Sequence, residues 1–133
     1  MKALFADTFY YLGLLNELDE HHDEAVAASR QPRLRIVTTA WVLVEVADAF
    51  ATSRTRRRIK TFIERLEADT KVKFVPATQE LFDRGLALYD ARPDKEWSLT
   101  DCISFVVMQD EGLTDALTGD HHFQQAGFEA LLA

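Results

Sequence analysis

The chain has 133 residues, 47% of them hydrophobic and 28% charged, which is typical of one globular domain rather than a disordered segment. Its one cysteine, Cys102, excludes an intrachain disulfide. The sequence shows no apolar run near ~18 residues and no secretory signal, so we expect a cytoplasmic protein without a membrane span. With 22 acidic against 15 basic residues, the net charge of −7 excludes nucleic-acid binding by overall charge, so any such role needs a local basic patch or metal ions.

Predicted strands and helices alternate along the whole chain. Short apolar runs bounded by turn residues predict strands, and apolar residues at helical spacing predict helices. In chain order these are a strand at 3–6, helices at 8–17 and 19–29, a strand at 35–38, helices at 40–51 and 56–68, a strand at 72–75, helices at 80–89 and 98–111, a strand at 116–118 and an edge strand at 128–132.

Two of these segments indicate how the domain is layered. Residues 3–6 form a continuous apolar run that ends at Asp7, which suits a strand covered by helices on both faces. Residues 40–51 are almost wholly apolar and contain no glycine or proline, so we expect a buried helix, capped by Thr38 or Thr39. The alternation predicts a single α/β domain over residues 1–133, with a central, mainly parallel β-sheet of about four to five short strands flanked by helices.

Four acidic residues stand where a carboxylate is costly or close to a strand end. Asp7 and Asp120 follow predicted strands, and ligand sites in open α/β sheets lie beyond the carboxyl ends of strands. Glu45 and Asp101 are set in apolar helices, where an ionised group needs a partner or a metal ion. If the four converge, they form an oxygen-rich pocket suited to Mg²⁺ or Mn²⁺ rather than Zn²⁺.

Each of these acids also has a purely structural interpretation. Asp7 could cap the helix that follows it, and Asp101 could form a capping box with Ser98. Glu45 could pair with an arginine, and Asp120 could be a turn residue before a short helix. The sequence alone leaves these alternatives open.

The motifs around these acids resemble those of the PIN domain family. They are Phe5-Ala6-Asp7-Thr8, Val44-Glu45, Trp97-Ser98-Leu99-Thr100-Asp101-Cys102, and Leu117-Thr118-Gly119-Asp120-His121-His122-Phe123, which together span nearly the whole chain.

The resemblance implies a single PIN-like nuclease domain that hydrolyses RNA phosphodiesters with Mg²⁺ or Mn²⁺. Asp7, Glu45, Asp101 and Asp120 would be the catalytic and metal-binding residues, and the fourth position could instead be filled by Asp115. Asp48, one helical turn after Glu45, is a further substitute. Thr8 and Thr118 match small polar positions that often support the site.

Many members of this family are ribonuclease toxins of the VapC type, which pair with an antitoxin and commonly form homodimers. The resemblance therefore implies an RNA substrate, a cognate antitoxin and a homodimer as partners. A housekeeping RNA-processing nuclease is the alternative within the family, and the sequence does not distinguish it from a toxin. A receiver-type signalling domain is disfavoured, because Pro76 rather than an acid follows the third strand.

One basic patch interrupts the acidic chain. It is either a solvated helix face or a contact for RNA or a partner protein, and it consists of Arg54, Arg56, Arg57, Arg58 and Lys60. A PIN fold that binds RNA or protein through this patch, with little catalysis, is thus a third hypothesis.

Two other features are expected to be structural. Cys102 lies on the apolar side of its helix, which predicts a core position. The pairs at 21–22 and 121–122 are adjacent histidines, which we do not expect to face the same way on a helix, so a histidine metal site is disfavoured.

Overall fold

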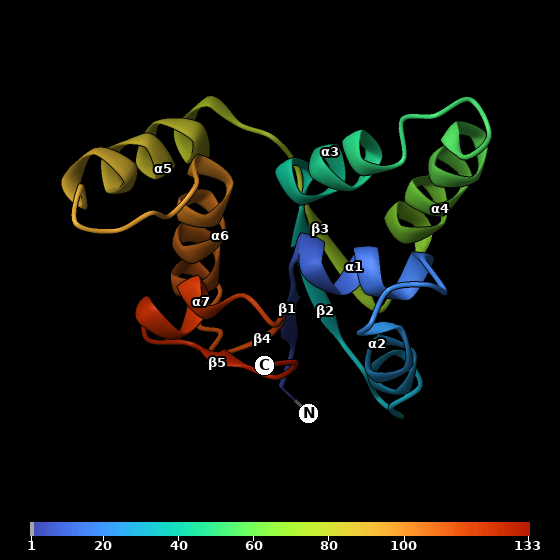
Figure 1. The fold of residues 1–133 in the computed structure, drawn as a ribbon. Helices are drawn as coiled ribbons and strands as arrows, with labels where there is room; N and C mark the ends of the chain where they lie inside the picture. The colour runs from blue at the N-terminus through green and yellow to red at the C-terminus, as the bar shows by residue number, and fades with distance from the viewer. Residues whose placement is uncertain (1) are drawn as a thin grey trace.

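The computed structural model describes residues 2–133, which contain one sheet of five short parallel strands (Figure 1). The strands lie in the order β3-β2-β1-β4-β5. They are β1 (Leu4–Ala6), β2 (Ile36–Thr39), β3 (Val72–Val75), β4 (Asp115–Leu117) and β5 (Glu129–Ala130).

The central strand β1 is where the order of the strands reverses. Phe5 of β1 is in register with Val37 of β2 on one side and with Ala116 of β4 on the other. The chain adds β2 and β3 outward from one edge of β1, and β4 and β5 outward from the other. Ligand sites in open α/β sheets lie at such a reversal, beyond the carboxyl ends of the strands. The order also differs from 2-1-3-4-5, the arrangement of receiver domains.

Helices cover both faces of the sheet (Figure 1). On one side lie α5, α6 and α7, with α5 packed against α6, and on the other side lie α1, α2 and α4. The helices are α1 (Thr8–Leu15), α2 (His22–Ser29), α3 (Ala40–Ala49), α4 (Arg56–Ala68), α5 (Gln79–Ala91), α6 (Leu99–Asp110) and α7 (His121–Gln125).

The structure confirms the predicted α/β architecture and shifts several boundaries. The helix expected at 19–29 begins only at His22, because the side chains of Asn16 and Asp19 accept backbone N–H bonds and hold a turn before it. The sequence pattern does not predict α7 as an element of its own, although a short helix after Asp120 is one interpretation of that residue.

The buried helix expected at 40–51 is present but only partly buried. The α3 helix ends at Ala49, and Val44 is 57% exposed, so one face of this helix lies at the surface. Thr39 caps α3 by accepting from the N–H of Val42, whereas the Thr38 hydroxyl donates to the carbonyl of Ala6 in β1. Cys102 is fully buried in the core, as predicted.

No helix within residues 2–133 has the length and apolarity needed to cross a membrane.

Candidate active site

Asp7 sits at the sheet reversal, directly after β1. The residue is 5% exposed, and its side chain makes no capping bond to α1, so capping does not explain its position. The Thr118 hydroxyl, at the end of β4, donates to its Oδ2 at 2.8 Å. Burial raises the pKa of Asp7 to about 7, helped by the nearby Asp101 and Asp120 and opposed by the Thr118 bond. The neutral Thr118 hydroxyl therefore only partly offsets the cost of a negative charge on Asp7.

Glu45, in α3, contacts Thr8, the residue that follows Asp7. Its Oε1 accepts a 2.6 Å hydrogen bond from the hydroxyl of Thr8, the first residue of α1. Among residues 2–133, the partner of Glu45 is this hydroxyl and not an arginine, so the proposed arginine pair is not formed. Thr8 thus fixes one carboxylate oxygen and leaves the other free.

Asp101 has both a structural and a site position. It forms the capping box of α6 with Ser98: the Ser98 hydroxyl accepts from the Asp101 N–H, and Asp101 Oδ2 accepts from the Ser98 N–H at 3.2 Å. The same Oδ2 lies 3.1 Å from Nδ1 of His122. Burial is the main reason that the pKa of Asp101 is raised, and the charge of Asp120 adds to it.

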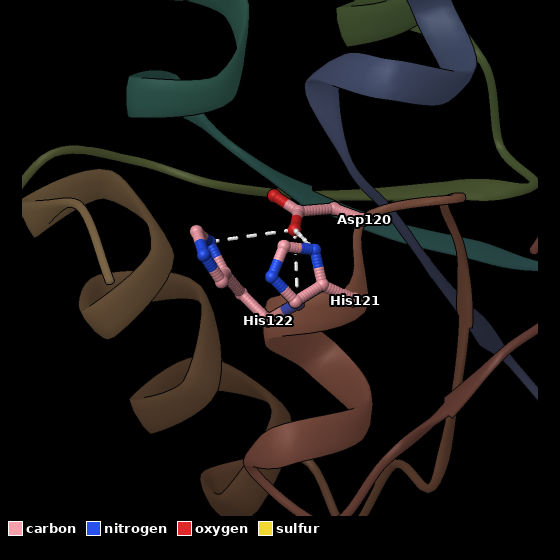
Figure 2. Close-up of side chains that lie close together, drawn as sticks. All are labelled: Asp120, His121 and His122. Atoms are coloured by element: carbon pink, nitrogen blue, oxygen red, sulfur yellow. Dashed lines mark hydrogen bonds and ion pairs between the residues drawn. The ribbon is translucent and has the colours of Figure 1, made fainter. Parts of the chain in front are cut away.

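Asp120 brings two histidines together (Figure 2). It caps α7, its Oδ1 accepting from the His122 N–H at 2.9 Å. The same oxygen lies 3.8 Å from Nδ1 of His121 and 3.4 Å from Nδ1 of His122, whose rings are 4.4 Å apart. The expectation that these adjacent histidines face apart is wrong, because both stand in the first turn and fold back toward the capping carboxylate.

All four predicted acids line one cavity of about 520 Å³, called the acidic cavity below. Asp115 does not line it: it begins β4, whereas the cavity follows the carboxyl ends of β1 and β4. Asp48 is exposed and lines a different cavity. The acidic cavity is bounded by Asp7, Thr8, Phe9, Glu45, Glu96, Ser98, Asp101, Asp120 and His122.

Glu96 and His122 are cavity residues that the sequence interpretation missed. Glu96 stands two residues before Ser98, the cap of α6, and that proximity is the signal that could have found it. For His122, the adjacent histidine argues against a ligand role in the sequence, yet the structure places it in the cavity lining beside Asp120. With both included, the cavity presents five carboxylates and one imidazole, a donor set that fits a hard divalent cation such as Mg²⁺ or Mn²⁺.

Comparison with known proteins agrees with this geometry. The family model described as "PIN domain" matches residues 4–129. The chain belongs to the PIN domain family. This PIN domain is 28% identical over 127 residues to the 23S rRNA-specific endonuclease VapC20 of two Mycobacterium tuberculosis strains, a match that covers 94% of this chain and 95% of the relative.

A solved structure shares the fold of this PIN domain. It is the crystal structure of the Mycobacterium tuberculosis sarcin–ricin loop cleaving toxin VapC20, with a TM-score of 0.81 and 26% sequence identity. The match covers 94% of this chain and 95% of that chain.

The structure of the PIN domain divides the predicted basic patch into two faces of α4. Arg54 precedes the helix in an exposed turn. Arg56 and Lys60 line a cavity of about 670 Å³ together with Glu64 and Glu67, so acids offset them. A second cavity of about 380 Å³ contains no acid in its lining, and we call it the arginine pocket: Leu15, Arg57, Arg58, Thr61, Phe62 and Arg65. Arg57 lines both cavities.

Proposed function

We propose that this PIN domain is a metal-dependent endoribonuclease that hydrolyses RNA phosphodiesters at the acidic cavity. The observation that carries the proposal is the convergence of Asp7, Glu45, Asp101 and Asp120 on one cavity at the sheet reversal. Membership of the PIN family and the similarity to an RNA endonuclease support it. Ribosomal RNA, the substrate named for VapC20, is the first substrate to test.

The donor set favours Mg²⁺ or Mn²⁺ as cofactor, held by Asp7, Glu45, Asp101 and Asp120. Such an ion, when bound, neutralises phosphate oxygens, lowers the pKa of a water that attacks phosphorus, and stabilises the leaving oxygen. A divalent charge would also relieve the repulsion that contributes to the raised pKa of Asp7.

The chain's own residues would hold this arrangement rigid. Thr118 fixes Oδ2 of Asp7 and, through its oxygen, accepts from the Asp120 N–H at 3.1 Å. Thr8 fixes Oε1 of Glu45. Two buried or half-buried hydroxyls therefore orient the carboxylates of Asp7 and Glu45 without adding charge, and one of them also holds the backbone of Asp120. These groups need little reorganisation when an ion or a phosphate arrives.

The arginine pocket is the favoured place for the RNA backbone to extend beyond the acidic cavity. Thr8, at the start of α1, lines the acidic cavity, and Leu15, at its end, lines the arginine pocket. An eight-residue helix is about 12 Å long, so the two sites lie within reach of one RNA strand. Because the chain carries a net charge of −7, a local cluster of guanidinium groups is needed to attract phosphates.

A cleavage assay with matched variants tests the proposal. We expect intact ribosomes or ribosomal RNA to be cut in Mg²⁺ or Mn²⁺, with no cutting in excess chelator. Asp120→Asn should abolish cutting, whereas Asp115→Asn, a neighbouring acid outside the cavity, should not. Binding of RNA without cleavage in either metal would favour the binding-module hypothesis. Cleavage that persists in chelator would contradict the metal requirement.

We further propose that the protein acts in the cytoplasm as the toxin of a toxin–antitoxin pair, with a cognate antitoxin and a homodimeric state. The similarity to VapC20, which is a toxin, supports this role. Expression without the partner should arrest growth, and Asp120→Asn should relieve the arrest. Growth unaffected by an enzyme that is active in vitro would favour an RNA-processing role.

A further inference from the structure

Asp120, His121 and His122 form a mixed nitrogen and oxygen cluster at the edge of the acidic cavity (Figure 2). One ligand atom from each residue can be chosen so that all lie within 4.8 Å of one another. We propose that this cluster binds a transition-metal ion through both imidazoles, so that the site prefers Mn²⁺ to Mg²⁺. The inference deepens the proposed function, on which it rests, by naming the metal.

The spacing of the cluster suits coordination by one ion. Oδ1 of Asp120 lies 3.4 Å from Nδ1 of His122 and 3.8 Å from Nδ1 of His121. Ligand atoms about 2.0–2.2 Å from an ion stand roughly 3–4 Å apart when they are neighbours in its coordination shell. The three donors therefore need only small side-chain movements to enclose a cation.

The exposure of the three side chains also suits an ion that arrives from solvent. His121 is 70% exposed, Asp120 29% and His122 20%. The side chain of His121 can change its rotamer without disturbing the core. The capping bond from the His122 N–H fixes Oδ1 of Asp120, and the ring of His122 lies with its Nδ1 3.1 Å from Oδ2 of Asp101. Asp120 and His122 are therefore held in place, and His121 is free to adjust to an incoming ion.

The chemistry of the donors sets the preference between ions. Mg²⁺ strongly prefers oxygen ligands and keeps much of its water, whereas first-row transition-metal ions also accept imidazole nitrogen, Mn²⁺ the most weakly of that series. An all-carboxylate cavity would discriminate weakly between Mg²⁺ and Mn²⁺. Two imidazoles at its edge add favourable binding free energy for Mn²⁺ that Mg²⁺ does not receive.

A second role for His122 competes with ligation. Its Nδ1 lies 3.1 Å from Oδ2 of Asp101, so the ring could act only by positioning that carboxylate. A glutamine at this position can still donate to Asp101, but its neutral amide nitrogen is not a metal ligand. The substitution His122→Gln therefore separates ligation from positioning.

The decisive experiment uses Mn²⁺ and Mg²⁺ alone, without RNA. Calorimetry should give wild-type protein at least about tenfold higher affinity for Mn²⁺ than for Mg²⁺. The spin-echo spectrum of bound Mn²⁺ should show modulation from ¹⁴N. Both His122→Gln and His121→Ala should reduce the Mn²⁺ preference, and the ¹⁴N signal should vanish in the double variant. As a control, His22→Gln changes a histidine whose Nδ1 contacts the carbonyl of Gly13 outside the cavity, and it should change neither quantity.

Three results would overturn the inference, and they reach the proposed function differently. Mn²⁺ that binds without ¹⁴N modulation would show that the histidines are not ligands. An unchanged ratio of Mn²⁺ to Mg²⁺ affinity in both variants would leave His122 as a positioning residue. In both cases cleavage of RNA in Mg²⁺ can persist, so the nuclease proposal survives. Failure of wild type to bind either ion would overturn this inference and the metal dependence together.

Discussion

The hydroxyl of Thr118 donates a 2.8 Å hydrogen bond to Oδ2 of Asp7, joining the ends of β4 and β1 across 111 residues of chain. Thr118 is fully buried, and its oxygen also accepts from the Asp120 N–H. Thr118→Val keeps the shape but leaves both polar partners without this hydroxyl. We expect the free energy of unfolding to fall by about 1–3 kcal/mol, measured by urea titration in chelator.

The control for this prediction is Thr114→Val, at the other end of β4. Its hydroxyl is exposed and contacts Asp115, so the change should stay within about 0.5 kcal/mol. Equal effects of the two substitutions on the free energy of unfolding would show that the Thr118 hydrogen bond does not stabilise the fold more than an exposed one.

Asp7 should make the metal-free protein less stable as the pH rises. Its folded pKa of about 7 exceeds the ordinary value of 3.8, so the folded state holds the proton more tightly than the unfolded state does. Stability from this group is complete below about pH 4 and is lost as the pH rises through about 7. Asp7→Asn avoids the cost of ionising a buried carboxylate. In chelator at about pH 8, its free energy of unfolding should therefore exceed that of wild type by about 1–4 kcal/mol.

Thermal or urea unfolding of the two proteins between about pH 5 and pH 8 measures this difference. It should widen with rising pH and level off above about pH 7. Addition of Mn²⁺ should stabilise wild type selectively, since the ion binds the folded carboxylate form. A difference that stays constant with pH would contradict the raised pKa.

Substitution of Asp101 should lower cleavage activity strongly and the free energy of unfolding only slightly. Asp101→Asn removes the charge, but its side-chain oxygen can still accept from the Ser98 N–H and keep the capping box. We expect cleavage of RNA to fall on the order of 100-fold or more, with a change in unfolding free energy below about 1 kcal/mol. The measurements are single-turnover cleavage and urea unfolding.

Ser98→Ala is the contrasting substitution, because it removes the oxygen that accepts from the Asp101 N–H. It should lower the free energy of unfolding by about 1 kcal/mol. If Asp101→Asn destabilises the protein as much as Ser98→Ala does, the carboxylate serves mainly the helix start.

The local pattern predicted most of the fold because each element carries its own signal. The helix predicted at 56–68 and the strand predicted at 72–75 match α4 and β3, since their apolar spacing and the Pro76 stop are local features. The boundaries near His22 depend on side-chain bonds to backbone N–H groups within one turn, which apolar periodicity does not report.

The candidate site was partly predictable for the same reason. Asp7 and Asp120 follow strands, and the topology of a parallel sheet brings such positions to one edge. Glu96 and His122 line the cavity through the geometry of two helix starts, and only for Glu96 does proximity to a predicted helix cap give a signal in the sequence. The division of the arginines between two faces of α4 also depends on what each face meets in the folded chain.

The arginine pocket should contribute to RNA affinity more than the opposite face of α4 does. The double variant Arg58→Gln with Arg65→Gln changes two cations of the pocket, and Arg56→Gln with Lys60→Gln removes the same charge beside Glu64 and Glu67. Binding of RNA is measured in the Asp101→Asn background and in chelator, so that cleavage is suppressed.

The slope of log affinity against log salt should become shallower by about 1–1.5 for the pocket variant, because each lost phosphate contact removes about 0.7. The control pair should change the slope by less than half of that. An equal loss of RNA affinity in both variants would mean that only net charge matters. If neither variant loses RNA affinity, a protein partner for the arginine pocket would be favoured.

Gly85 should resist substitution because α5 and α6 approach closely there. A Cβ at this position would collide with Cγ1 of Ile103 and lie 3.2 Å from its Cα, so the backbone of α6 would have to move. Gly85→Ala should therefore cost about 1–3 kcal/mol by urea unfolding, although alanine is the better helix former. In α1, a Cβ on Gly13 would lie 3.4 Å from Cβ of Ala25, an ordinary contact, and Gly13→Ala should be neutral or stabilising by up to about 1 kcal/mol. Stabilisation by both substitutions would show that helix propensity outweighs the packing of α5 on α6.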